Sequence, residues 1–324
     1  MRTLILAERP FRDLRSRAWL LDLPRRYADA GPLLVAMPHA GAPTGFTAVD
    51  QDPDPAALGV QRVVIAGAFQ EAAQIERAFA TASRAVQAGA RLETAAFSVA
   101  RACALRDPPV GAEVLDAATS LEMRDWFSAD RMMLWRIAVT PHLRPYPEAA
   151  LAADDSLAAL LPPGPLLGLA VMDGAAMRRD WMAMLPALAE RLAPFAGIPV
   201  LPLPSEHMEL PSDDYAGSLA FAAAALPGTP ILLPQLADRV WRRRELSPAR
   251  LKGLVARCAL VVTNQDIPAA FATAAGLPVL GLALGGDRRI VVCLSQLANR
   301  LAPGSALLYP PRAGSALASS SARA

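Results

Sequence analysis

The sequence predicts an α/β protein with two domains, each built on a parallel sheet covered by helices. The chain has 324 residues, which is enough for two domains of ordinary size. Short apolar runs alternate with helical patterns along most of its length, as they do where parallel strands are joined by crossover helices. Hydrophobic residues make up 53% but aromatic residues only 6%. This composition favours helices packed on sheets over an aromatic-rich all-β fold.

The first half contains four apolar runs that we interpret as strands. In chain order they are "RTLILA", "PLLVAMP", "VQRVVIAGAF" and "RLETAAFSV". A helix is expected from about residue 70 to 88, between the third and fourth runs. The segments "AEVLDAATSLEMRDWFSADRMML" and "RIAVTPHLRPYP" then form one further unit of the same half. We therefore assign residues 1–160 to an N-terminal domain.

The second half begins near Leu166, after a linker in "AADDSLAALLPPGP", where prolines and a glycine interrupt regular structure. Its expected strands are "PLLGLAVM", "IPVLPLP" and "TPILLP", separated by the helices "MRRDWMAMLPALAERL" and "DDYAGSLAFAAAAL". We assign residues 166–312 to a C-terminal domain. Residues 313–324 are small and polar, and we expect a flexible tail there.

The last strand–helix–strand unit of this domain has well-marked ends. Ser247 and Pro248 suit the start of a helix, whose buried stripe extends to Cys258. The strand "ALVVT" follows, and the next helix has proline in its first turn and Gly276 at its C-terminal cap. Pro278 then opens the strand "PVLGLAL". Two strands of one parallel sheet are therefore expected here.

Both of these strands end in a polar loop. The first loop carries Asn264, Gln265 and Asp266, and the second carries Gly285, Gly286, Arg288 and Arg289. Because parallel strands end at one edge of the sheet, we expect the loops to be neighbours at the edge where ligands bind. A helix N-terminus, flexible glycine backbone and two guanidinium groups suit a phosphate or a carboxylate. The alternative is a simple turn with solvated arginines.

Composition and motifs exclude several other classes of protein. The net charge of +2 gives no argument for nucleic-acid binding. Three widely spaced cysteines indicate neither disulfides nor a zinc site. No dinucleotide or P-loop fingerprint is present, so we expect no cofactor. The N-terminus becomes charged too early for a secretion signal, and the most apolar regions contain proline and glycine, so we expect a cytoplasmic protein without transmembrane segments.

The second half resembles the C-terminal domain of the polysaccharide pyruvyl transferase family. The resemblance covers roughly residues 110–300. The segment "LEMRDWFSADRM" is similar to the family's arginine, aspartate, serine element, here Arg124, Asp125 and Ser128, which the family follows with a strand such as "IAVTP". The structural alternative is an ion pair of Arg124 with Asp125 at a helix start. The closing unit "SPARLKGLVARCALVVTNQDIPAAFATAAGLPVLGLALGGDRR" is similar to the family's last unit. The resemblance implies two Rossmann-like domains facing each other across a cleft, as in GT-B enzymes. It also implies transfer to a phosphorylated or nucleotide-linked sugar in surface polysaccharide biosynthesis, with phosphoenolpyruvate as donor.

The sequence departs from that family where its chemistry is expected. The family's arginine and histidine after the strand "ALVVT" correspond here to Gln265 and Ile267, which lack the positive charge and the transferable proton. The same stretch is similar to heptosyltransferases at Asn264 and Pro268, but Gln265 and Ala270 replace the acidic residue and the histidine of that group. A glycosyl transferase and a catalytically inactive subunit that binds a protein or a glycan therefore remain alternatives.

Three histidines are available for acid–base chemistry: His39, His142 and His207. His207 lies beside Glu206 in a loop after a strand of the second half, where a carboxylate could orient it as a general acid or base. A surface loop histidine is the alternative, and His142 suits a structural role. The basic run "DRVWRRREL" is typical of a solvated face, with a partner or peripheral membrane surface as the alternative.

Overall fold

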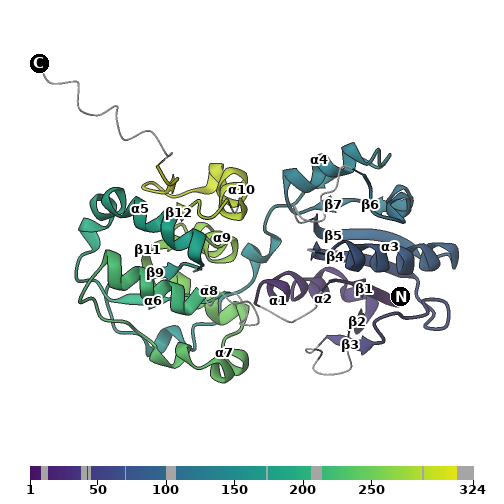
Figure 1. The fold of residues 1–324 in the computed structure, drawn as a ribbon. Helices are drawn as coiled ribbons and strands as arrows, with labels where there is room; N and C mark the ends of the chain where they lie inside the picture. Colours follow the sequence, from purple (N-terminus) through teal and green to yellow (C-terminus); the bar gives the residue numbers. More distant parts are fainter. Residues whose placement is uncertain are drawn as a thin grey trace, which may run out of the picture. The chain divides into compact units, whose positions relative to one another are not determined.

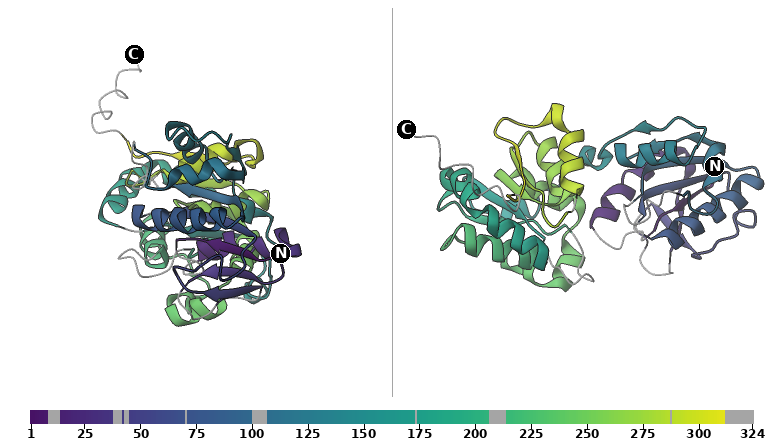
Figure 2. Two further views of the ribbon diagram at one scale, coloured as in Figure 1. Left: turned by 90° about the vertical axis from the view of Figure 1, so that its right-hand side faces the viewer. Right: turned by 45° about the horizontal axis from the view of Figure 1, so that its top comes forward.

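The computed structural model describes residues 1–8, 14–37, 42, 45–69, 71–99, 107–172, 174–205, 214–286 and 288–311 (Figure 1). The chain divides into two compact units, Met1–Leu151 and Ala152–Ala324. Each unit contains a sheet whose strands pair in parallel, and Figure 2 shows helices on both faces of each sheet. The prediction of two Rossmann-like α/β domains is therefore confirmed.

The sheet of the first unit follows the order β3-β2-β1-β4-β5-β7-β8, and β6 also pairs with β5. The strands are β1 (Thr3–Leu6), β2 (Leu33–Ala36), β3 (Phe46–Val49), β4 (Arg62–Phe69), β5 (Arg91–Val99), β6 (Ala118–Ser120), β7 (Glu122–Met123) and β8 (His142–Leu143). The central strands β1 and β4 are buried on both faces, which explains their continuous apolar sequences. The strand expected at "IAVTP" is wrong, because the extended pairing begins only after Pro141.

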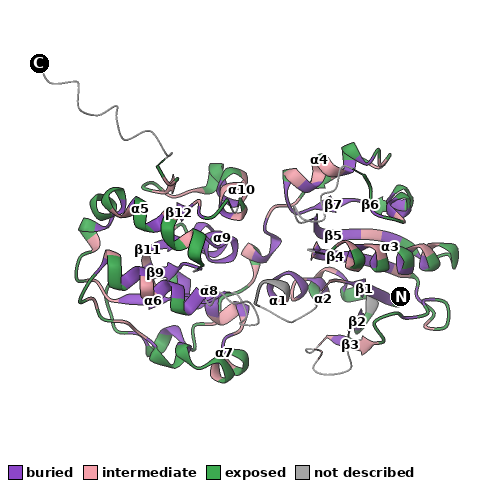
Figure 3. Ribbon diagram, in the orientation of Figure 1, coloured by how far each residue is buried: buried purple, intermediate pink, exposed green. Residues whose placement is uncertain are grey.

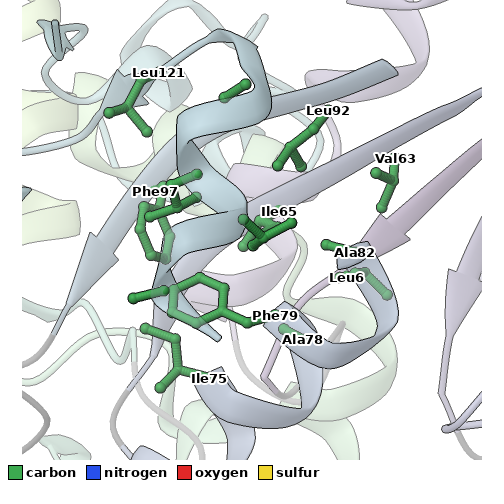
Figure 4. Packing of buried hydrophobic residues seen from close by; sticks show 14 of the residues in the cluster. Leu6, Val63, Ile65, Ile75, Ala78, Phe79, Ala82, Leu92, Phe97 and Leu121 are labelled. Carbon is green, nitrogen blue, oxygen red and sulfur yellow. The ribbon is translucent and has the colours of Figure 1, made fainter. Parts of the chain in front are cut away.

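The helices of this unit are α1 (Leu14–Leu20), α2 (Leu23–Arg26), α3 (Ala72–Gln87) and α4 (Trp126–Leu134). The core on one face of the sheet is made by Ile75, Phe79 and Ala82 of α3, which pack with Ile65 and Phe97 (Figure 4). A second cluster contains Leu20 and Leu23 with Ile5 and Val64, so α1 and α2 cover the opposite face. Alternate residues of β4 thus point into two separate cores.

Gly67 interrupts the pairing of β4 with β5 and allows a tryptophan to approach the sheet. Its backbone has φ +80°, and the register shifts between Ala66 and Ala68. A Cβ atom at Gly67 would lie 2.6 Å from Cε3 of Trp19. We expect Gly67→Ala to lower the free energy of unfolding by about 2–4 kcal/mol, because it adds left-handed backbone strain to a steric clash.

Gly89→Ala is the matched control for this variant, measured in the same denaturant titration. Gly89 also has positive φ, +89°, but no atom lies within 4 Å of a Cβ built on it. Only the backbone strain then remains, so we expect Gly89→Ala to lower the free energy of unfolding by about 1 kcal/mol. Equal losses for both variants would show that the approach of Trp19 contributes nothing.

The sheet of the second unit follows the order β10-β9-β11-β12-β13. Its strands are β9 (Leu166–Ala170), β10 (Val200–Pro202), β11 (Cys258–Thr263), β12 (Val279–Leu282) and β13 (Ala306–Leu308). The helices are α5 (Ala175–Leu192), α6 (Asp214–Ala225), α7 (Arg239–Glu245), α8 (Pro248–Ala256), α9 (Asp266–Ala274) and α10 (Arg289–Gln296). Helices α5 and α6 share a core with Leu167, Leu169 and Leu280, whereas Gly281 points to α10 on the other face.

Two expectations for this unit are wrong in detail. The segment "TPILLP" forms a single bridge, between Ile231 and Val200, and no strand. Leu233 adopts φ 51° and is followed by proline, so the extended backbone cannot continue. Cys258 opens β11 instead of closing the preceding helix, although it is buried as the stripe predicted. Burial raises the pKa of the Cys258 thiol to about 12, against a smaller opposing effect of Arg257, so this thiol stays protonated at neutral pH.

The division between the units falls after Leu151, whereas the sequence placed it between residues 160 and 166. Residues 152–165 pack against the second unit. Asp154 donates its backbone N–H to the carbonyl of Ala249, and the Arg257 side chain donates to the carbonyls of Ala158 and Pro162. Gly253 lies so close to the backbone of Asp154 that a side chain there would clash with it.

Candidate functional site

The carboxyl ends of β9, β11 and β12 lie at one edge of the second sheet, since these strands pair in parallel. The residues that follow them are Met172, Asn264 and Gly285, each at the start of a connection to the next helix. This is the edge at which open α/β sheets bind ligands. The two polar loops were expected to be neighbours, and the strands that they follow, β11 and β12, are indeed adjacent and parallel in the sheet.

Asn264 links the ends of β9 and β11. Its Oδ1 accepts from the backbone N–H of Met172 at 2.9 Å, and its Nδ2 donates to the carbonyl of Met172 at 3.4 Å. Nδ2 also lies 3.6 Å from the sulfur of Met177. The side chain is 2% exposed. Asn264 therefore holds two neighbouring loops together through its own amide.

Gln265 and Asp266 are also interior residues, 1% and 3% exposed. Gln265 donates its backbone N–H to Oγ1 of Thr263 at 2.7 Å and its side-chain Nε2 to Oδ1 of Asn264 at 3.1 Å. Its Oε1 is buried without a hydrogen-bond partner in the described part of the chain. Asp266 opens α9, where a carboxylate is favoured by the helix dipole. Asn264, Gln265 and Asp266, which were predicted to face a ligand, are thus buried beneath the edge of the sheet.

The loop after β12 is more exposed. Gly285 and Gly286 both adopt left-handed backbone, with φ 58° and 72°. The N–H of Gly285 donates to Oδ2 of Asp180 at 2.7 Å, which places a carboxylate against the loop. Gly286 and Arg288 are exposed, whereas Arg289 is half-buried with Nη2 3.9 Å from the sulfur of Met172. The Arg289 contact joins the loop after β12 to the loop after β9.

The structure thus brings together Asn264, Gln265, Asp266, Gly285 and Arg289 around the ends of three strands. Met172, Met177 and Asp180 belong to the same edge but did not stand out in the sequence. Nothing in the local pattern singles them out, because they lie 87 to 117 residues before the side chains and backbone groups that they contact. Glu206 and His207 lie outside the described residues, as does His39. His142 is exposed in β8.

The described residues on either side of the Glu206–His207 segment are close together. The backbone N–H of Ser205 donates to Oδ2 of Asp214 at 2.6 Å, and both residues are buried. Asp214 is in turn 3.9 Å from Nη1 of Arg242. Ser205 and Asp214 therefore lie together after the carboxyl end of β10, which pairs with β9 in the sheet.

In the first unit, Asp125 and Ser128 join β5 to α4. Oδ1 of Asp125 accepts from the backbone N–H of Ser128 at 2.7 Å, which caps the helix, and Oδ2 accepts from Oγ of Ser98 at 2.6 Å. The hydroxyl of Ser128 accepts from the N–H of Val99 at 2.9 Å. These contacts give the pair a structural role in closing a strand end onto a helix start.

Arg124 is buried beside this cap and contacts aromatic rings and a carboxylate. Its Nη2 donates to Oε1 of Glu148 at 2.5 Å. The guanidinium carbon lies 4.4 Å from the ring centre of Trp19 and 4.5 Å from that of Tyr146. Arg124 and Glu148 are 3% and 0% exposed. Arg124 thus forms a buried ion pair with Glu148, a residue 24 positions later in the chain.

Among the described residues, no group of three or more His, Cys, Asp or Glu side chains could hold a metal ion. None of the helices in this part of the chain has the length and apolar character needed to cross a membrane.

No protein-family model matches the chain, and no curated protein matches it in sequence. Solved structures with a similar layout include a putative UDP-N-acetylglucosamine 2-epimerase from Listeria monocytogenes, with TM-score 0.49 and 10% identity over 87% of this chain and 79% of that one. ADP-heptose lps heptosyltransferase II of E. coli gives TM-score 0.47 and 13% identity over 97% and 92% of the two chains. At such scores and identities the likeness says nothing about the activity of the present chain.

Proposed function

We propose that the chain is a cytoplasmic transferase that acts on a phosphorylated or nucleotide-linked sugar in surface polysaccharide biosynthesis. The observation that carries the proposal is the meeting of three loops at the carboxyl edge of the second sheet, joined by Asn264 and Arg289 to Met172. Such an edge is where α/β enzymes hold phosphorylated ligands. In this proposal Arg288 and Arg289 bind the phosphate or carboxylate, and Gly286 lets the ligand approach the backbone.

Asp180 limits which groups can bind an anion at this edge. Its carboxylate already accepts from the N–H of Gly285, so that donor is not offered to a ligand. The exposed Arg288 and the backbone of Gly286 are the groups best suited to contact a phosphate. In this proposal His207 is the general acid or base and the neighbouring carboxylate of Glu206 orients it, and phosphoenolpyruvate is the donor that the resemblance implies.

Calorimetric titration tests the proposal with three probes: UDP, ADP and phosphoenolpyruvate. We expect at least one probe to bind, and Arg288→Gln to weaken its affinity about tenfold or more, as for loss of a charged hydrogen bond. Arg191→Gln, an exposed arginine of α5 in the same unit, is the control and should leave the affinity unchanged. Absence of binding by all three probes, or equal affinity in Arg288→Gln, would overturn the proposal.

A second candidate function is supported by the two residues that replace the expected reactive pair. Gln265 and Ile267 are 1% and 2% exposed, so neither can present a charge or a proton to a ligand. In this alternative the chain is a catalytically inactive subunit that binds a glycan or a protein. If a probe binds but no phosphate or nucleotide is released from it in the presence of any sugar acceptor, the result supports an inactive binding subunit. Release of phosphate or nucleotide supports the transferase.

A further inference from the structure

Helix α7 presents a continuous group of cations to solvent. At about 100° per residue, Arg239, Arg243, Val240 and Arg244 follow one another around roughly 140° of the helix. All four residues are exposed, Val240 to 71%. Figure 3 shows much of α7 in the green of exposed residues. We call these four residues the arginine arc. The acidic residue of the helix, Glu245, is half-buried on the opposite side, so the arc contains no carboxylate.

The other side of α7 is fixed to the second unit, which keeps the arginine arc directed outward. Arg242 is 3% exposed, and its guanidinium carbon lies 5.5 Å from the ring centre of Tyr215. Asp238 caps the helix by accepting from the backbone N–H of Val240 at 2.8 Å and of Trp241 at 3.3 Å. The helix is thus held by the buried Arg242 and by the Asp238 cap, and neither contact uses an arginine side chain of the arc.

The positive charge of the arc is local. The whole chain has a net charge of +2, so the residues outside the three arginines of the arc together carry −1. Arg244 does pair with Oε1 of Glu245 at 2.8 Å, but its side chain is 74% exposed, and such pairs are readily exchanged for other anions. Attraction to an anionic surface would therefore arise at α7 and not from the protein as a whole.

We propose that the arginine arc docks the second unit on an anionic lipid surface. Cationic side chains gain attraction from acidic headgroups, and an apolar side chain among them gains by entering the headgroup layer. Val240 lies between Arg243 and Arg244 on the arc and would enter this layer, while the half-buried Trp241 belongs to a type favoured at membrane interfaces. A nucleic-acid backbone would match the charges but would leave Val240 without a partner.

Co-sedimentation with lipid vesicles tests this inference. The full chain should bind vesicles containing 30% phosphatidylglycerol about 100-fold more tightly than vesicles of phosphatidylcholine alone, at about fivefold for each arginine. Binding should weaken as salt rises from 10 to 150 mM, where the Debye length falls to about 8 Å. The triple variant Arg239→Gln, Arg243→Gln, Arg244→Gln should bind the two kinds of vesicle with equal affinity.

The matched control replaces three other exposed arginines of the same unit, Arg179, Arg191 and Arg300, by glutamine. It changes the net charge equally and should keep the native preference for anionic vesicles. Val240→Asp should weaken binding with all three arginines present. The inference would be overturned if both triple variants lost vesicle binding equally, or if the native chain showed no preference for anionic vesicles. It would also be overturned if the chain bound heparin and anionic vesicles could not displace the heparin.

Discussion

Arg124→Met is expected to lower the free energy of unfolding by about 3–5 kcal/mol, because it leaves the buried carboxylate of Glu148 without its cation. Glu148 is 0% exposed and accepts from Nη2 of Arg124 at 2.5 Å. Methionine fills much of the space between the Trp19 and Tyr146 rings, so the loss reports mainly on charge and not on a cavity. Chemical denaturation followed by circular dichroism measures the change.

The double variant Arg124→Met, Glu148→Leu separates the ion pair from the packing around it. Replacing both partners by apolar side chains removes the uncompensated charge, and we expect it to restore most of the stability that Arg124→Met loses. Arg77→Met, an exposed arginine of α3, is the control and should change the free energy by less than about 0.5 kcal/mol. A loss below about 1 kcal/mol in Arg124→Met would show that Glu148 does not depend on this cation.

The Arg124–Glu148 pair also shows what the sequence could and could not predict. The aspartate and serine that follow Arg124 predict a helix start, because a cap uses residues within one turn. The partner of Arg124 comes from the segment after β8, and no local rule connects the two. Buried ion pairs of this kind depend on the tertiary packing of separate segments.

The carboxyl edge of the second sheet shows the same limit. The apolar run "ALVVT" predicted β11, and the run that begins after Gly276 at Pro278 predicted β12. The parallel pairing of the two strands followed from the single helix between them. The sequence could not predict that the polar side chains after β11 would turn inward. Asn264 bonds to Met172 across 92 residues, and Gly285 bonds to Asp180 across 105. The elements were therefore predictable, whereas the orientation of the loop residues depended on neighbours distant in sequence.

Asn264→Leu is expected to lower the free energy of unfolding of the second unit by about 2–5 kcal/mol. The variant keeps the volume of the side chain but leaves the backbone N–H and carbonyl of Met172 without the amide that now pairs with both. Nε2 of Gln265 loses its acceptor as well. Each buried polar group left unpaired costs about 1–3 kcal/mol, and some of these groups will find water once the loop relaxes.

The same change distinguishes a structural role of Asn264 from its role in the proposed site. Asn264 fixes the end of β9 to the end of β11, so Asn264→Leu should also weaken binding of the probe identified by calorimetry, at a temperature where the variant is still folded. Asn299→Leu, an exposed asparagine of the same unit, should change neither quantity. If stability falls while affinity is unchanged, the ligand does not depend on the position of these loops, and the carboxyl edge of the second sheet is not where it binds.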